Sequence, residues 1–230
     1  MVFNGFQKLT LLDYPGKVAC TLFLAGCNFR CPFCHNASLV TEIDNSYQVS
    51  DTEVLAYLKK RTGVLEGVCV TGGEPLLRDD LGDFLKEVKA LGYSVKLDTN
   101  GSFPKKLEAL IKEGLVDYVA MDIKNCKEKY GLTVGVKDFD ITPIEKSVEL
   151  LKSGIIPYEF RTTIVSEFHQ MEDMPKIGQW IQGSAPYFLQ NFVDSGNLIQ
   201  GNLHGYDKEF LENLAENVRA FVPNAEIRGI

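Results

Sequence analysis

The sequence contains no apolar run that approaches the roughly 20 residues needed to cross a bilayer, so no membrane-spanning helix is expected. Its amino-terminal residues also lack the charged segment and following apolar stretch of a secretory signal peptide. We therefore expect a cytoplasmic protein. Basic residues are not in excess either, because 24 Lys and Arg face 31 Asp and Glu and give a formal net charge of −7. This balance argues against a broad nucleic-acid-binding surface, which is normally basic.

Internal repeats, low-complexity tracts and long linkers are absent as well, and 230 residues suit one α/β domain. We therefore expect a single domain over residues 1–230. Short β-rich runs alternate with amphipathic helical patterns, which predicts a parallel sheet with helices packed outside it. Six such units predict a partial, open (β/α)6 barrel, since a full barrel needs eight. The expected strands are residues 18–25, 67–70, 94–97, 116–121, 159–165 and 186–189.

Capping boxes predict two helix starts, because a Ser or Thr and a Glu three residues later can satisfy free backbone N–H groups. Ser50 with Glu53 forms the first box. Thr142 with Glu145 forms the second, and Pro143 suits the first turn of that helix.

Polar motifs stand at the ends of successive expected strands, where the carboxyl ends of a parallel barrel place an active site. Chance is a poor explanation for such signatures at so many strand ends. In chain order they are Cys27 after the first strand, Gly72-Gly73-Glu74 after the second, Asp98-Thr99-Asn100 at the third, Asp122-Ile123-Lys124 at the fourth and Arg161 on the fifth.

Cys27, Cys31 and Cys34 form a C-x3-C-x2-C motif. In a chain with no sign of secretion, such crowding indicates metal or redox chemistry rather than disulfides. Three thiolates can each ligate one iron of a [4Fe–4S] cluster and leave the fourth iron open to another molecule. A zinc site with His35 as fourth ligand is the alternative, although its adjacency to Cys34 makes joint ligation awkward. Three unrelated free thiols are a further alternative.

The cysteine spacing, with an aromatic residue before the last cysteine, resembles the signature of the radical S-adenosylmethionine superfamily. The resemblance implies that the open iron binds the amino and carboxylate groups of S-adenosylmethionine. Reduction then yields methionine and a 5′-deoxyadenosyl radical. Only Cys69 lies between residues 35 and 71, so a single cluster is expected. Cys20 and Cys69 are expected to be buried structural thiols, and Cys126 has no assigned role.

By the same resemblance, Gly72, Gly73 and Glu74 match a motif that contacts the methionine moiety, with Glu74 accepting a hydrogen bond from its ammonium group. The alternative is that the two glycines only permit a tight turn. Lys124 would face the cofactor or radical path, and Arg161 would engage the carboxylate. Solvated surface charges are the alternative for both.

Asp98, Thr99 and Asp122 resemble residues that hold a monovalent cation beside the S-adenosylmethionine carboxylate in glycyl-radical-enzyme activases. The carbonyl of Ala120 would be a further oxygen ligand, and oxygen ligands suit a hard cation. Residues 187–192 are expected to line the adenosine end, without the histidine that the activases place there. His169 and His204 are expected to be structural or exposed.

The segments GFQKLTLLDYPGK, GCNFRCPFCHN, GGEPLL, KLDTNGS and VDYVAMDIK most resemble the longer-type anaerobic ribonucleoside-triphosphate reductase activating proteins. That resemblance implies hydrogen abstraction from a glycine of this reductase, with a flavodoxin- or ferredoxin-type electron donor. Another glycyl radical enzyme is a close variant as partner. A radical enzyme that modifies a small molecule or an RNA nucleoside is the competing class, and a non-catalytic metal-binding module is remote.

Overall fold

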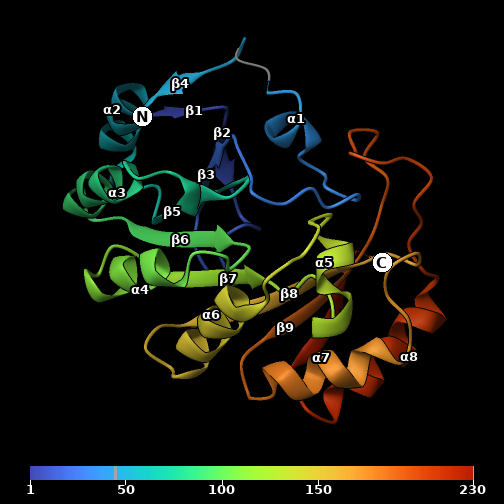
Figure 1. Ribbon diagram of the computed structural model, residues 1–230. Helices are drawn as coiled ribbons and strands as arrows, with labels where there is room; N and C mark the ends of the chain where they lie inside the picture. The colour runs from blue at the N-terminus through green and yellow to red at the C-terminus, as the bar shows by residue number, and fades with distance from the viewer. Residues whose placement is uncertain (44–45, 230) are drawn as a thin grey trace.

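The computed structural model describes residues 1–43 and 46–229, and its main feature is an eight-stranded sheet (Figure 1). The strand order is β10-β9-β8-β7-β6-β5-β3-β2, so β10 and β2 are the two open edges. All neighbours pair in parallel except the edge strand β2, which runs antiparallel to β3. In chain order the strands are β2 (Gly5–Thr10), β3 (Ala19–Leu24), β5 (Gly67–Gly72), β6 (Ser94–Thr99), β7 (Tyr118–Asp122), β8 (Tyr158–Ile164), β9 (Tyr187–Asn191) and β10 (Ala225–Arg228).

Helices follow the parallel strands, which confirms the predicted α/β class and its six strand–helix units. In Figure 1, α2, α3, α4 and α6 lie along the outside of the sheet, and α7 packs beside α8. The helices are α1 (Ala37–Val40), α2 (Asp51–Arg61), α3 (Leu81–Ala90), α4 (Pro104–Lys112), α5 (Tyr130–Thr133), α6 (Thr142–Lys152), α7 (Asp173–Ile181) and α8 (Lys208–Arg219), with short 3₁₀ turns at Pro75–Leu77 and Lys127–Lys129.

The predicted strands omit both sheet edges and a separate two-stranded ladder of β1 (Val2–Phe3) with β4 (Val49–Ser50). Three of the six residues of β2 are exposed and only one is buried, so its sequence lacks the continuous apolar character of a strand buried on both faces. Strand β10 has only four residues and joins the sheet by pairing with β9. Short edge strands carry little local signal because their partners lie far away in the chain.

The two predicted capping boxes have opposite outcomes. At α2 the Ser50 side chain accepts from the Glu53 N–H, and the Glu53 side chain accepts from the Ser50 N–H, as predicted. The box at Thr142 is wrong, because Thr142 is already the first helical residue of α6 and the N-cap residue is Ile141, which makes no side-chain capping hydrogen bond. Asp140 instead accepts a hydrogen bond from the Thr142 N–H at 3.0 Å, in the manner of an Asx turn.

The apolar core lies between the sheet and the helices that cover it. In α3, for example, Leu81, Phe84, Leu85 and Val88 are buried at helical spacing. Within the described residues, no helix combines the length and apolar character needed to span a membrane. The arrowheads of β6 and β7 in Figure 1 point towards the side on which α5 and the loop after β3 lie. That end of the sheet carries the polar motifs.

Candidate functional site

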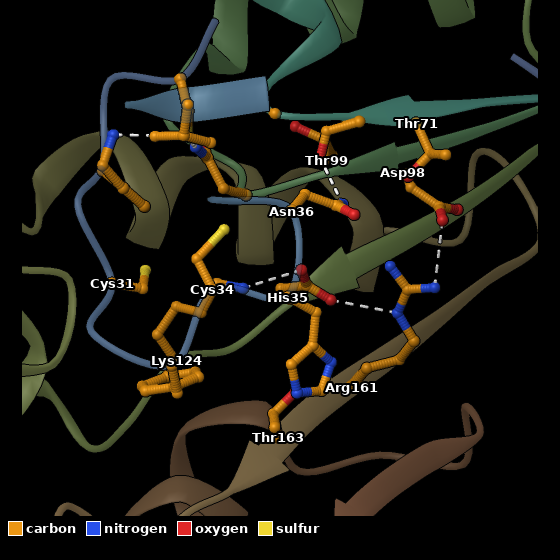
Figure 2. A pocket seen from close by; sticks show the side chains of 18 of the residues that line it. Cys31, Cys34, His35, Asn36, Thr71, Asp98, Thr99, Lys124, Arg161 and Thr163 are labelled. Atoms are coloured by element: carbon orange, nitrogen blue, oxygen red, sulfur yellow. Dashed lines mark hydrogen bonds and ion pairs between the residues drawn. The ribbon is translucent and has the colours of Figure 1, made fainter. Parts of the chain in front are cut away.

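A cavity of about 240 Å³ lies at the carboxyl ends of the parallel strands (Figure 2). Figure 2 shows Cys31 and Cys34 on one side of this cavity, with Asp98 and Arg161 on the other. Most of the predicted site residues line it, and their individual roles stay predictions. Glu74 and Ala120, whose carbonyl was a predicted cation ligand, are not among the lining residues. Those in the wall are Cys27, Cys31, Cys34, Gly72, Gly73, Asp98, Thr99, Asp122, Lys124 and Arg161.

The three cysteines of the motif lie on the loop that follows β3, and all three are free. Backbone contacts hold this loop, since the Gly26 N–H donates to the Leu39 carbonyl at 2.8 Å. Burial raises the pKa of Cys31 to about 12 and also raises the pKa of Cys27. Both are therefore neutral thiols until a metal displaces their protons.

The donor set of this loop fits a cluster with three protein ligands. Three soft sulfur donors share one cavity wall, and Lys124 supplies a positive charge that favours the thiolate of Cys31. Among the described residues, no three Cys, His, Asp or Glu side chains are already gathered as a metal-binding group.

His35 also lines the cavity, and its Nε2 atom is the one buried side-chain nitrogen or oxygen of the described residues without a hydrogen-bond partner. Its ring packs against Phe192 with 5.4 Å between ring centroids. Burial, followed by the charge of Lys124, lowers the pKa of His35. A buried polar atom without a partner is uncommon and points to a bound molecule or water. From the sequence, His35 is expected to have a role only in the alternative zinc site.

Gly72 and Gly73 allow the end of β5 to pack directly against the cysteine loop. Gly72 has φ +126°, and a Cβ built there would lie 2.2 Å from the Leu24 carbonyl oxygen. A Cβ at Gly73 would lie 2.0 Å from the Gly26 carbonyl oxygen. The tight-turn role is thus present, while the approach of this backbone to a ligand stays a prediction.

Glu74 is fully buried behind the cavity wall. Its carboxylate accepts hydrogen bonds from the Leu76 N–H at 3.0 Å, the Thr99 hydroxyl at 2.9 Å and the Asn100 N–H at 2.7 Å. Asn100 in turn donates to Asn28 at 3.0 Å and contacts the Cys27 sulfur at 3.8 Å. Glu74 therefore braces the loops after β5 and β6, and its predicted contact with a ligand ammonium stays a prediction.

A pH-dependent stability follows from the burial of Glu74, which raises its pKa from 4.5 to about 7. Because the folded state binds the proton more tightly, the stability due to this group is greatest below pH 4.5. It is lost as the pH rises to about 7, by up to about 3 kcal/mol. We expect the free energy of urea-induced unfolding of the wild type, relative to Glu74→Gln, to fall between pH 5 and pH 7.5. Parallel pH profiles for the two proteins would contradict this.

Four charged residues form an ion-pair network across β6, β7 and β8. Arg161 lies opposite Asp122 in the β7–β8 ladder and bonds it at 3.0 Å, while its other guanidinium nitrogen reaches Asp98 at 3.2 Å. Lys124 pairs with the second oxygen of Asp122 at 2.9 Å. The side chains of Lys124 and Arg161 are only 17% and 21% exposed, so the surface-charge alternative is wrong.

The network keeps its charges despite burial. Burial alone would raise the pKa of Asp122, but Lys124 and Arg161 outweigh it and lower the pKa to about 2. The pKa of Asp98 is lowered by Arg161 and a neighbouring lysine against the same opposing effect of burial. Both carboxylates are therefore ionised at neutral pH.

That neighbouring lysine, Lys96, was missed as a site residue, although a charged residue in the otherwise apolar strand 94–97 was an available signal. Asn36 was also missed, and it donates to the Gly72 carbonyl at 3.0 Å. Of the segment 187–192, Gln190 lines the cavity, while the Tyr187 hydroxyl is buried against Thr162 at 2.7 Å.

The remaining minor predictions hold. Cys20 and Cys69 are fully buried. His169 is buried and its Nε2 lies 2.8 Å from the Lys124 carbonyl, whereas His204 is exposed beside Glu167. Cys126, to which the sequence analysis assigns no role, is buried, and its sulfur lies 3.5 Å from a carboxylate oxygen of Asp173.

The family model of the Radical SAM superfamily matches residues 21–181, a segment that includes the predicted site residues from Cys27 to Arg161. The chain belongs to the radical SAM superfamily. Membership implies a [4Fe–4S] cluster and S-adenosylmethionine. In this radical SAM chain, the cysteine loop and the polar motifs at the strand ends meet at the cavity.

Several relatives are activating enzymes. A protein of Methanocaldococcus jannaschii named as a candidate glycyl-radical enzyme activating enzyme is 30% identical over 99% of this chain and 95% of its own length. The pyruvate formate-lyase-activating enzyme of Listeria monocytogenes is 30% identical over 78% of this chain and 75% of its own. A GTP 3′,8-cyclase of Helicobacter pylori is 34% identical over 67% of this chain, but this match spans only 47% of the cyclase.

Solved structures share the fold. Streptococcus suis SuiB bound to S-adenosylmethionine superposes with a TM-score of 0.69 over 91% of this chain and 52% of its own, at 16% identity. A domain of a pyruvate-formate lyase-activating enzyme from Bacteroides vulgatus gives a TM-score of 0.59 over 71% of this chain and 99% of its own, at 17% identity. At these identities the likeness concerns the fold of the radical SAM enzymes.

Proposed function

We propose that this radical SAM enzyme activates a glycyl radical enzyme, and that its partner is an anaerobic ribonucleoside-triphosphate reductase. The observation that carries the activase role is the near full-length similarity to a candidate activase of Methanocaldococcus jannaschii. Similarity to a pyruvate formate-lyase-activating enzyme supports the same class. The choice of the reductase as partner rests on the sequence motifs from Gly5 to Lys124 that resemble its activating proteins. Residues 1–230 would act as a single domain.

When bound, a [4Fe–4S] cluster supplies the electron that cleaves S-adenosylmethionine to methionine and a 5′-deoxyadenosyl radical. Cys27, Cys31 and Cys34 would hold that cluster. Arg161 and Lys124 would orient the carboxylate of the methionine moiety through charge-assisted hydrogen bonds. Their ion pairs with Asp98 and Asp122 hold the two cations at the cavity wall in advance, which lowers the entropy cost of binding.

Gly72, Gly73, Glu74 and Asp98 complete the proposed S-adenosylmethionine site. The glycines bring the β5 end against the cysteine loop, and Glu74 fixes the relative position of the next strand end. A monovalent cation on Asp98, Thr99 and Asp122, which the sequence resemblance implies, would have to compete with partners that these side chains already have. The Thr99 hydroxyl already donates to Glu74 at 2.9 Å, and both aspartates are paired with protein cations.

A radical enzyme acting on a small molecule is the second candidate, because a GTP 3′,8-cyclase is 34% identical over two thirds of this chain. The shortness of the match relative to the cyclase weighs against it. The two candidates differ in their substrate, which for an activase is a glycine of a large protein.

Electron paramagnetic resonance of the reconstituted protein tests the proposal. The reduced enzyme, with a flavodoxin- or ferredoxin-type donor, is incubated anaerobically with S-adenosylmethionine and the anaerobic ribonucleotide reductase of the same organism. We expect a glycyl-type doublet on the reductase that is absent without S-adenosylmethionine. Formation of 5′-deoxyadenosine without a doublet would overturn this choice of partner and retain the radical chemistry. No 5′-deoxyadenosine would overturn the proposed function.

A further inference from the structure

Lys96 is a buried cation beneath the cavity. Its side chain is only 2% exposed, and its ammonium group is ion-paired with the carboxylate of Asp98. Cys69 lies opposite it in the β5–β6 ladder, with the sulfur 3.9 Å from the ammonium nitrogen. An ammonium group is rarely buried to this degree without a specific partner, because removal from water is costly.

The position of Lys96 on β6 places it directly under Asp98. Side chains two residues apart on a strand point to the same face, so both lie on the inner face of the sheet. Asp98 contributes to the cavity wall, whereas Lys96 is not among the lining residues. The ammonium therefore reaches Asp98 from the protein side and Arg161 reaches it from the cavity side.

The charges of this network do not cancel. Its carboxylates are Asp98 and Asp122, and its cations are Lys96, Lys124 and Arg161, so three positive charges face two negative ones. Burial raises the pKa of Cys69 well above its ordinary value, so that thiol is neutral. The buried acid Glu159 lies 3.8 Å from Arg228, and its negative charge also acts on Arg161. Within this network alone the cations exceed the carboxylates by one, while the buried carboxyl of Glu74, whose pKa is raised to about 7, lies near enough to interact with Asp122.

We propose that Lys96 is the resident counter-ion of Asp98, a positioning residue that takes the place of a bound monovalent cation. Its charge neutralises Asp98 from below and leaves Arg161 and Lys124 available to an anionic group in the cavity. The inference rests on the proposed function, in which that group is the carboxylate of S-adenosylmethionine. It makes added Na⁺ or K⁺ unnecessary for binding.

Equilibrium dialysis of S-adenosylmethionine against the reconstituted protein tests this inference. Binding is measured anaerobically at constant ionic strength in choline, Na⁺, K⁺ or NH₄⁺ chloride. We expect the wild-type affinity to be the same in all four salts. Lys96→Ala should bind about tenfold more weakly in choline, because the guanidinium of Arg161 must then neutralise Asp98 alone. NH₄⁺ should restore most of the lost affinity by entering the space of the missing ammonium.

Lys89→Ala is the matched control, since Lys89 pairs with Asp117 at 2.7 Å and lies outside the cavity. This variant should bind like the wild type in every salt. Lys96→Arg keeps the charge and should retain more affinity than Lys96→Ala. If the alanine variant does not fold, Lys96→Arg is compared with the wild type in its place.

Three outcomes would overturn the role of Lys96 alone: a wild-type affinity that requires Na⁺ or K⁺, unchanged affinity in Lys96→Ala, or a loss that NH₄⁺ does not restore. The first outcome would favour the bound cation on Asp98, Thr99 and Asp122. Failure of the wild type to bind S-adenosylmethionine in any salt would instead overturn the proposed function, and the inference with it.

Discussion

Replacement of Cys31 by alanine is expected to abolish iron binding and cleavage of S-adenosylmethionine. Cys31 is the most buried of the three motif cysteines and lies in the cavity wall with Cys27 and Cys34. A [4Fe–4S] cluster whose fourth iron is open to another molecule depends on all three cysteine ligands, so loss of one is expected to prevent its assembly. The expected result is loss of about four irons and four sulfides per chain, and of 5′-deoxyadenosine formation, in anaerobically reconstituted protein.

Cys20→Ala is the matched control for this change. Cys20 is a fully buried free thiol on β3 outside the cavity, so its removal tests for a general effect of losing a buried cysteine. It should keep its iron and its activity. Full iron content in Cys31→Ala would contradict the ligand assignment. Stoichiometric zinc in the wild type, with no iron after reconstitution, would favour the Cys3His alternative that includes His35.

Replacement of Gly73 by alanine is expected to destabilise the fold of the site itself. The added Cβ would lie 2.0 Å from the Gly26 carbonyl oxygen and 3.3 Å from the Cys27 Cβ. Both atoms are part of the cysteine loop, one in its backbone and one at the base of a side chain. The steric clash can therefore be removed only if the loop moves. We expect a loss of about 3 kcal/mol in the free energy of unfolding of the apoprotein, together with reduced iron uptake.

Gly201→Ala is the control for Gly73→Ala, because a Cβ built at Gly201 meets nothing within 4 Å. Its unfolding free energy should stay within about 0.5 kcal/mol of the wild type. Urea unfolding monitored by circular dichroism measures both variants. An unfolding free energy of Gly73→Ala equal to that of the control would show that the loop accommodates the side chain, contrary to the packing described here.

The two changes probe different levels of the site. Cys31 supplies a ligand. Gly73, which has no side chain, lets the end of β5 pack closely against the cysteine loop and so positions that loop. The Gly73 N–H donates to the Leu24 carbonyl at 2.8 Å, so the same backbone contact joins β5 to the end of β3. If both variants lose iron but only Gly73→Ala loses stability, the role of Cys31 as a ligand is distinguished from the role of Gly73 in positioning the loop.

The sequence by itself determined the features that depend on local spacing. The strand–helix alternation predicted six parallel strands, and all six are present. The cysteine spacing and the polar residues after successive strands predicted the cavity wall, because parallel strands bring their carboxyl ends to one edge. Residues that lie a fixed number of positions from a strand end can be placed without knowledge of their partners.

The tertiary structure alone decided which partners those residues have. Glu74 turned out to be a buried brace rather than a member of the cavity wall, because Thr99 and Asn100 surround its carboxylate. Lys96 became part of the charge network because the ladder sets it opposite Cys69 and below Asp98. Burial and ion pairing depend on strand register and on contacts between segments far apart in the chain. For this reason the spacing of residues predicted where the site lies, and the packing determined how its charges are balanced.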